Sequence, residues 1–102
     1  MNYYFHPESL HEFIEAVRYY SNISRSLANA FVAQVEHGIN QILLFPETWA
    51  EIEPDIRRYL IKRFPFAIFY TIETNDTILI HAIMHLSRKP GFWKDRITTN
   101  KP

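Results

Sequence analysis

The sequence of 102 residues lacks cysteine and contains only two glycines. The lack of cysteine excludes disulfides, thiolate metal ligands and a cysteine nucleophile. The two glycines, Gly38 and Gly91, are too few for the glycine-rich loops that bind nucleotide phosphates. No apolar run reaches the roughly 20 residues of a membrane-spanning helix, because His81 interrupts the longest stretch, residues 77–84. We therefore expect a soluble, cytoplasmic protein that needs no cofactor.

The residues that are present fit a single domain. Apolar residues make up 47% of the chain and aromatic residues 16%. A chain of this size buries roughly two-thirds of its unfolded surface, which suffices for one core. Residues 1–102 are therefore assigned to one domain.

The formal net charge of zero conceals an unequal distribution of charge. Residues 1–55 carry two basic and eight acidic side chains, a charge of −6, whereas residues 56–102 carry nine basic and three acidic side chains, a charge of +6. A basic second half favours an anionic partner. The alternative is that these charges only solvate two surfaces.

The first half of the chain predicts one strand and two helices. The aromatic residues 3–6 favour a strand, and Pro7 suits the first position of a helix. Ser24 can cap a second helix, which extends to about Leu44 and ends before Pro46. Because the link between the helices is short, they are expected to form an antiparallel hairpin.

Two features interrupt this pattern. Gly38 lies inside the second helix and costs about 1 kcal/mol relative to alanine, so we expect either a close approach of the first helix or a kink. Residues 45–55 contain two prolines and predict a surface loop. Trp49 and Ile52 are expected to attach this loop to the core.

The apolar period changes from 3.6 to 2 after residue 55, which predicts strands at 56–64, 66–72 and 78–85. The last of these is expected to be central, with four residues on one face, namely Ile78, Ile80, Ala82 and Met84. The predicted fold class is α+β. Its order is β-α-α-β-β-β, with an N-terminal strand and a helical hairpin packed on a mostly antiparallel sheet.

The histidines do not predict a metal site. His81 and His85 are four residues apart, and four residues of a strand span about 13 Å. Two ligands of one metal ion each lie about 2 Å from it, so this pair is too far apart. Ser87 lacks the G-x-S-x-G setting of a nucleophilic serine.

The candidate catalytic residues are Arg63, His85 and Arg88, which the strand pattern places at one end of the sheet. Arginine is suited to binding phosphate, and histidine can move a proton at neutral pH. Together these groups could cleave RNA without a metal. The alternative is structural: His85 only fixes the end of a strand by a hydrogen bond, and the cationic residues 57–63 protect a sheet edge.

Four segments resemble the RelE/ParE toxin superfamily, in the same order along the chain. They are residues 5–8 with the helix that follows, residues 45–47, the run 57–70, and the pattern Ala82-x-x-His85-x-x-Arg88-x-Pro90-x-x-Trp93. The resemblance covers nearly the whole chain. It implies the toxin of a bacterial type II toxin–antitoxin system, a plasmid stabilisation protein that inhibits growth. It also implies a cognate antitoxin as partner, in a toxin–antitoxin hetero-oligomer.

The target implied by the resemblance depends on the branch of the superfamily. RelE-like members are ribosome-dependent mRNA endoribonucleases, whereas ParE-like members inhibit DNA gyrase. The neutral net charge and the absence of any tyrosine after Tyr70 favour the ParE-like branch. A relative that has lost activity and only binds antitoxin is a third alternative.

We expect antitoxin or target to bind the cationic and aromatic residues of the second half, namely Arg57, Arg58, Lys62, Trp93, Lys94 and Arg96. For Trp93, packing in the core is the alternative. Arg57, Arg63 and Arg88 are expected to converge on one docking surface.

Overall fold

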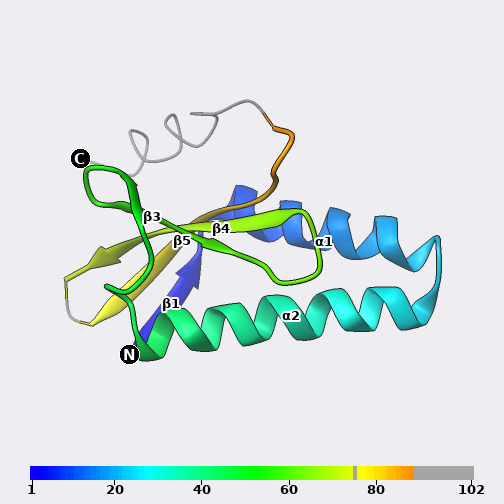
Figure 1. Cartoon of the computed structure of the whole chain (residues 1–102), viewed down its shortest axis with the longest axis horizontal. Coiled ribbons are helices and arrows are strands. Elements are labelled where there is room, and N and C mark those ends of the chain that lie inside the picture. Colours follow the sequence, from blue (N-terminus) through cyan, green and yellow to red (C-terminus); the bar gives the residue numbers. More distant parts are fainter. Residues whose placement is uncertain (75, 89–102) are drawn as a thin grey trace.

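The computed structural model describes residues 1–74 and 76–88, which form two helices and one five-stranded sheet (Figure 1). The elements are β1 (Asn2–Phe5), α1 (Pro7–Ser21), α2 (Arg25–Leu44), β2 (Glu51–Glu53), β3 (Ile56–Leu60), β4 (Phe66–Glu73) and β5 (Thr77–His85). The strand order is β1-β5-β4-β3-β2. β1 is parallel to β5, and all other neighbours are antiparallel. The predicted α+β class, with its helical hairpin on a mostly antiparallel sheet, is confirmed.

Local sequence explains where the helices begin. The backbone N–H of Glu8 donates to Nδ1 of His6 at 3.1 Å, and Pro7 occupies the first helical position. The N–H of Leu27 donates to Oγ of Ser24 at 3.0 Å, so the predicted cap of α2 is confirmed. Both contacts satisfy backbone donors that the first turn of a helix leaves without an internal partner.

The main core lies between the helical hairpin and the sheet. Phe31 of α2 is fully buried at its centre, with ring centroids 5.0 Å from Tyr20, 5.2 Å from Phe64 and 5.1 Å from Phe66. Fully buried aliphatic side chains surround these rings, among them Val35, Ile42, Ile68, Ile78 and Ile80. This core attaches both helices to β4 and β5.

A β-bulge in β5 changes which residues face the helices. Phe69 pairs with Ala82 and Tyr70 pairs with Ile80, so His81 is an extra residue opposite the continuous strand β4. Beyond the bulge, Ile83 joins the core under the helices, while Ala82 and Met84 join a second cluster with Phe69. The predicted common face of residues 78, 80, 82 and 84 is therefore wrong after Ile80. A strict period of two cannot show an inserted residue.

The segment that follows α2 is held by two side chains from the sheet. The hydroxyl of Tyr70 donates to the carbonyl oxygen of Pro46 at 2.7 Å. Nη1 of Arg57 donates to the carbonyl oxygens of Glu47 and Trp49 at 2.9 and 2.8 Å. The Trp49 ring also packs edge-on against Tyr59 at 4.8 Å, as expected of a residue that attaches the segment to the core.

Two boundaries differ from the predictions in this region. The predicted loop contains the short strand β2, which pairs with β3 and whose Ile52 packs against the second cluster. The predicted strand 56–64 ends at Leu60, because the chain turns there and Arg63 adopts a positive φ of 72°. Pairing with a neighbouring strand created β2, and three residues are too few to give a periodic signal.

Gly38 permits close packing of α2 on the sheet. A Cβ atom at this position would lie 2.7 Å from Cε1 of Tyr59 and 3.2 Å from Cδ1 of Ile68. The expected close approach therefore exists, but it involves β3 and β4 rather than α1.

We predict that Gly38→Ala lowers the free energy of unfolding by about 1–3 kcal/mol, because overpacking outweighs the gain in helix propensity. Urea unfolding measures the change. Asn40→Ala is the matched control, since this residue is exposed on the same helix and should change stability by less than about 0.5 kcal/mol. An equal or higher stability of Gly38→Ala would contradict the packing argument.

The burial of the Tyr70 hydroxyl predicts that the stability of the fold depends on pH. Burial raises the pKa of Tyr70 from 10.0 to about 12, although nearby Arg57 lowers it. The unfolded chain releases this proton near its ordinary pKa, so the stabilisation is complete below pH about 10 and is lost as the pH rises through about 12. Tyr70→Phe should therefore show a shallower loss of stability across this range, measured by urea unfolding. If the stability of both proteins fell equally with pH, Tyr70 would not be the group responsible.

Candidate functional site

The candidate site lies where β1 ends, since from there on no strand of the described residues pairs with this edge of β5. β1 pairs only with residues 77–80 of β5. At the end of this pairing, the backbone N–H of His6 and Oγ of Ser9 both donate to the carbonyl oxygen of Ile80, each at 2.9 Å. The carboxylate of Glu12 accepts a hydrogen bond from the N–H of Ile83 at 3.1 Å. These contacts fix α1 against the end of β5.

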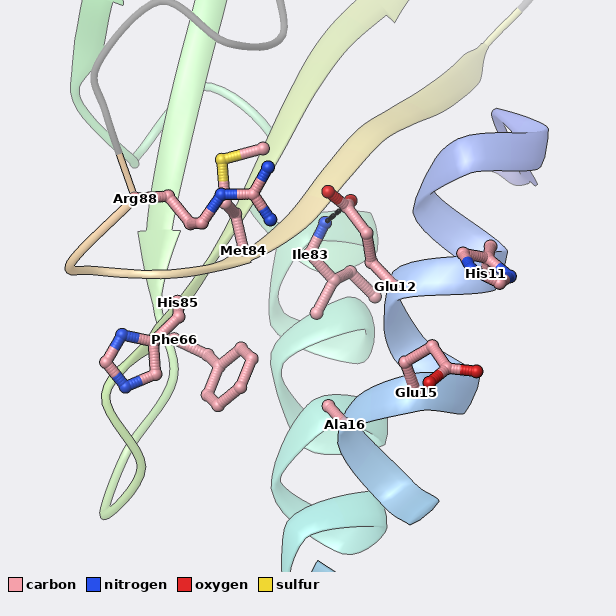
Figure 2. A pocket seen from close by; sticks show the side chains of 9 residues that line it. All are labelled: His11, Glu12, Glu15, Ala16, Phe66, Ile83, Met84, His85 and Arg88. Atoms are coloured by element: carbon pink, nitrogen blue, oxygen red, sulfur yellow. Dashed lines mark hydrogen bonds between the residues drawn. The ribbon is translucent and has the colours of Figure 1, made fainter. Parts of the chain in front are cut away.

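A cleft of about 360 Å³ lies between α1 and this end of the sheet (Figure 2). Its lining combines apolar side chains with charged and imidazole groups, namely His11, Glu12, Glu15, Ala16, Phe66, Ile83, Met84, His85 and Arg88. A second hollow of about 340 Å³ shares Phe66 and His85 with it, so the two lie next to each other along α1. Tyr19 and Ile23 line the second hollow, and both are exposed.

Contacts within the turn after β5 hold the imidazole ring of His85 in place. Nδ1 of His85 lies 3.0 Å from the backbone nitrogen of Ser87, which donates to it, and 2.7 Å from Oγ of the same serine. The imidazole packs edge-on against Phe66 at 5.2 Å. The N–H of Arg88 donates to the carbonyl oxygen of His85 at 3.0 Å, which closes the turn.

The three candidate catalytic residues lie at the same end of the sheet but not in one cleft. His85 and Arg88 line the cleft, and the guanidinium group of Arg88 points toward the carboxylate of Glu12 (Figure 2). Arg63 belongs to the turn between β3 and β4, which is joined to the turn after β5 by the hydrogen bond from Leu86 N–H to the carbonyl oxygen of Pro65 at 2.8 Å. Arg63 lines neither of the two hollows.

The candidate binding residues are dispersed. The guanidinium group of Arg57 donates hydrogen bonds to the segment after α2. Its Nη2 atom lies 3.5 Å from Oε1 of Glu51, and the side chain is 20% exposed. Arg58 is exposed and faces the opposite side of β3, and Lys62 is exposed in the following turn. The expected common surface of three arginines is therefore not formed, because Arg57 stabilises a loop. Three further candidates, Trp93, Lys94 and Arg96, lie outside the described residues.

Sequence reasoning missed the wall that α1 contributes to the cleft. That wall consists of His11, Glu12, Glu15 and Ala16, and none of them was assigned to a site from the sequence. Their spacing along one helix face was the only available signal. It could not show that this face lies over an uncovered strand edge.

Within residues 1–74 and 76–88, no cluster of three or more metal-ligating side chains is placed to hold a metal ion. In the same part of the chain, neither helix has the length and apolarity to cross a membrane.

The fold and its cleft define a small α+β domain with a helical hairpin packed on one sheet. The family model described as the ParE toxin of the type II toxin–antitoxin system parDE matches residues 3–90. The chain therefore belongs to the ParE toxin family, and the resemblance to RelE/ParE toxins is confirmed.

One solved structure shows how far the fold is shared. It comes from a chromosomal ParDE toxin–antitoxin system of P. aeruginosa and superimposes with a TM-score of 0.65 at 15% sequence identity. The match covers 83% of this chain and 95% of that chain. No curated protein matches this sequence.

We predict that Glu12→Ala lowers the free energy of unfolding by about 1–3 kcal/mol, because the N–H of Ile83 loses its partner. Glu12→Gln should recover most of the loss, since its amide oxygen can accept the same hydrogen bond. Urea unfolding and hydrogen exchange at the Ile83 amide measure the effect. Glu15→Ala is the control, because Glu15 forms an exposed ion pair with Arg18, and exposed pairs contribute little to stability. An equal loss in both alanine variants would refute the role of Glu12.

Proposed function

We propose that the chain is the toxin of a type II toxin–antitoxin module and that DNA gyrase is its target. The observation that carries this proposal is the ParE family match over residues 3–90. A cognate antitoxin neutralises the toxin by forming a hetero-oligomer with it. The action takes place in the cytoplasm and requires no cofactor.

The arrangement at His85 supports binding rather than RNA cleavage. A histidine that acts as a general base needs an imidazole nitrogen with a free lone pair facing its substrate. In this turn the lone pair of Nδ1 is used by the N–H of Ser87, so the neutral ring carries its proton on Nε2. Arg63, the third member of the candidate nuclease set, does not line the cleft.

The charge of the cleft also favours a protein partner. Two carboxylates, Glu12 and Glu15, line it together with apolar side chains. The closely spaced phosphates of RNA would be repelled by these carboxylates. A disordered antitoxin segment avoids this repulsion on the second hollow, whose described lining contains no carboxylate. Acidic residues of that segment suit the charge of +6 in the second half of the chain, and its ordering offsets part of the binding energy.

The antitoxin is expected to cover the exposed apolar residues beside the second hollow. Tyr19 and Ile23 are 63% and 60% exposed, and both lie at the end of the helical hairpin next to Pro65. Exposed apolar side chains of this size that line a hollow are typical of protein interaction sites. Binding of the antitoxin would then cover the second hollow, which His85 also lines.

We predict that expression of the chain without antitoxin stops growth, induces the DNA-damage response and leaves mRNA intact. The purified toxin should inhibit supercoiling by gyrase in vitro. Co-expression of a cognate antitoxin should restore growth. Asn40→Ala, on the exposed side of α2, is the matched control and should remain fully toxic.

Two outcomes would replace the proposed target. Cleaved mRNA with unaffected supercoiling would establish the RelE-like endoribonuclease alternative, in which His85→Ala or Arg88→Ala relieves growth arrest without unfolding the protein. Normal growth on expression alone would establish an inactive relative that only binds antitoxin.

A further inference from the structure

The outer edge of β1 is exposed and carries no charged side chain. β1 is the last strand on its side of the sheet, and among the described strands it pairs with β5 alone. Its side chains Tyr3 and Tyr4 are 41% and 62% exposed. A hollow of about 420 Å³ lies between this strand and Leu43 of α2, and its described lining contains no charged side chain. The edge is therefore open, aromatic and neutral.

The opposite edge of the sheet differs in charge. It is formed by the three residues of β2, of which Glu51 and Glu53 carry carboxylates. Short, charged edge strands prevent pairing with another chain, because an exposed neutral edge offers its backbone groups to any further strand. β1 has no charge, no proline and no bulge. It thus has the properties of an edge that accepts a further strand.

The pairing of β1 with β5 determines which backbone groups point away from the sheet. The N–H groups of Asn2 and His6 donate to the carbonyl oxygens of residues 76 and 80, at 3.0 and 2.9 Å. Alternate residues of a strand direct their backbone groups to opposite sides. Tyr4 therefore also faces β5, whereas the N–H and C=O groups of Tyr3 and Phe5 point toward the outer edge.

We propose that the outer edge of β1 pairs with β1 of a second copy of this chain, so that two sheets join across a twofold axis. The two strands are antiparallel, because a twofold axis perpendicular to the sheet reverses the strand direction. In this register Tyr4 lies opposite Tyr4 of the second copy, and Tyr3 lies opposite Phe5. Each Tyr3–Phe5 pair exchanges two backbone hydrogen bonds, so every outward-pointing N–H of both strands has an acceptor.

The composition of the edge favours a second copy over an acidic segment of another protein. No cationic side chain lines the hollow beside β1 within the described residues, so a carboxylate there would lose hydration without gaining an ion pair. β1 itself is neutral, and its aromatic residues favour strands and stabilise cross-strand pairs. Leu44 and Phe45 directly follow Leu43 and are exposed, so they provide further apolar surface that association can bury.

This edge is separate from the surface proposed for the antitoxin. β1 precedes α1, whereas Tyr19 of the second hollow lies near the end of that helix. A helix of 15 residues is about 22 Å long. Self-association through β1 therefore does not depend on the proposed target or on the proposed antitoxin surface.

The lack of native cysteine allows a direct test of the register. In Tyr4→Cys the two sulfurs face each other across a non-hydrogen-bonded pair with Cα atoms about 4.5 Å apart, so mild oxidation should give a disulfide-linked dimer. Tyr3→Cys is the matched control. The two Tyr3 positions are diagonal neighbours roughly 7–8 Å apart, beyond the usual reach of a disulfide, so this variant should stay monomeric on a gel without reductant.

Sedimentation equilibrium of the full-length chain measures the association itself. We expect a weak dimer with a dissociation constant in the micromolar range, as is typical of a small interface. Tyr3→Pro removes an N–H that points outward and leaves the pairing with β5 intact, so the dissociation constant should rise about tenfold or more. Tyr3→Val keeps the N–H and should stay within about threefold of wild type.

Tyr4→Lys is a second disruptive variant, for the case that proline prevents folding. It places two ammonium groups opposite each other at an exposed position and should also weaken the dimer. Urea unfolding checks that both variants are folded.

Three results would overturn the inference: a wild-type chain that is monomeric at about 1 mM, equal cross-linking of Tyr3→Cys and Tyr4→Cys, or a dimer that Tyr3→Pro and Tyr4→Lys leave unchanged. A Tyr3 amide that becomes protected from hydrogen exchange only when antitoxin binds would overturn it as well, because the edge would then belong to a strand of the antitoxin.

Discussion

The uncovered edge of β5 is the constraint on which the cleft depends. β1 has four residues and β5 has nine, so the backbone of β5 continues beyond its parallel neighbour. Burial of an unpaired N–H is costly, and α1 supplies Glu12 as the acceptor for Ile83. The helix is thereby fixed where it forms one wall of the cleft, while the turn after β5 forms the other.

The bulge in β5 determines which side chains lie at this edge. One extra residue, His81, reverses the facing of all later residues of the strand, so that Ile83 packs under the helices and His85 lies against Phe66. Without the bulge, the same sequence would direct His85 to the other face of the sheet.

The arginines illustrate how one side-chain type serves different purposes. Arg57 holds two carbonyl oxygens of the segment after α2, so its guanidinium group replaces backbone pairing in a loop. Arg88 lines the cleft, and Arg63 stays in the neighbouring turn. The net neutrality of the chain follows from acidic residues on the helices and the loop after α2, two of which, Glu12 and Glu15, face the cleft itself. This mixture suits a protein partner better than a polyanion.

Local patterns in the chain were sufficient for the helices, the start of α1 at Pro7, the cap of α2 at Ser24 and the two long strands, because hydrophobic period and capping are properties of neighbouring residues. The cap of α1 by His6 was not predicted. The family resemblance also followed from ordered motifs. The folded molecule alone decided the strand β2, the bulge at His81 and the partner of Gly38, since each depends on residues that are distant in sequence. It also decided that Glu12 joins the cleft and that Arg57 does not. The positions of these two side chains depend on pairing between strands that are distant in sequence. The local hydrophobic period carries no information about that pairing.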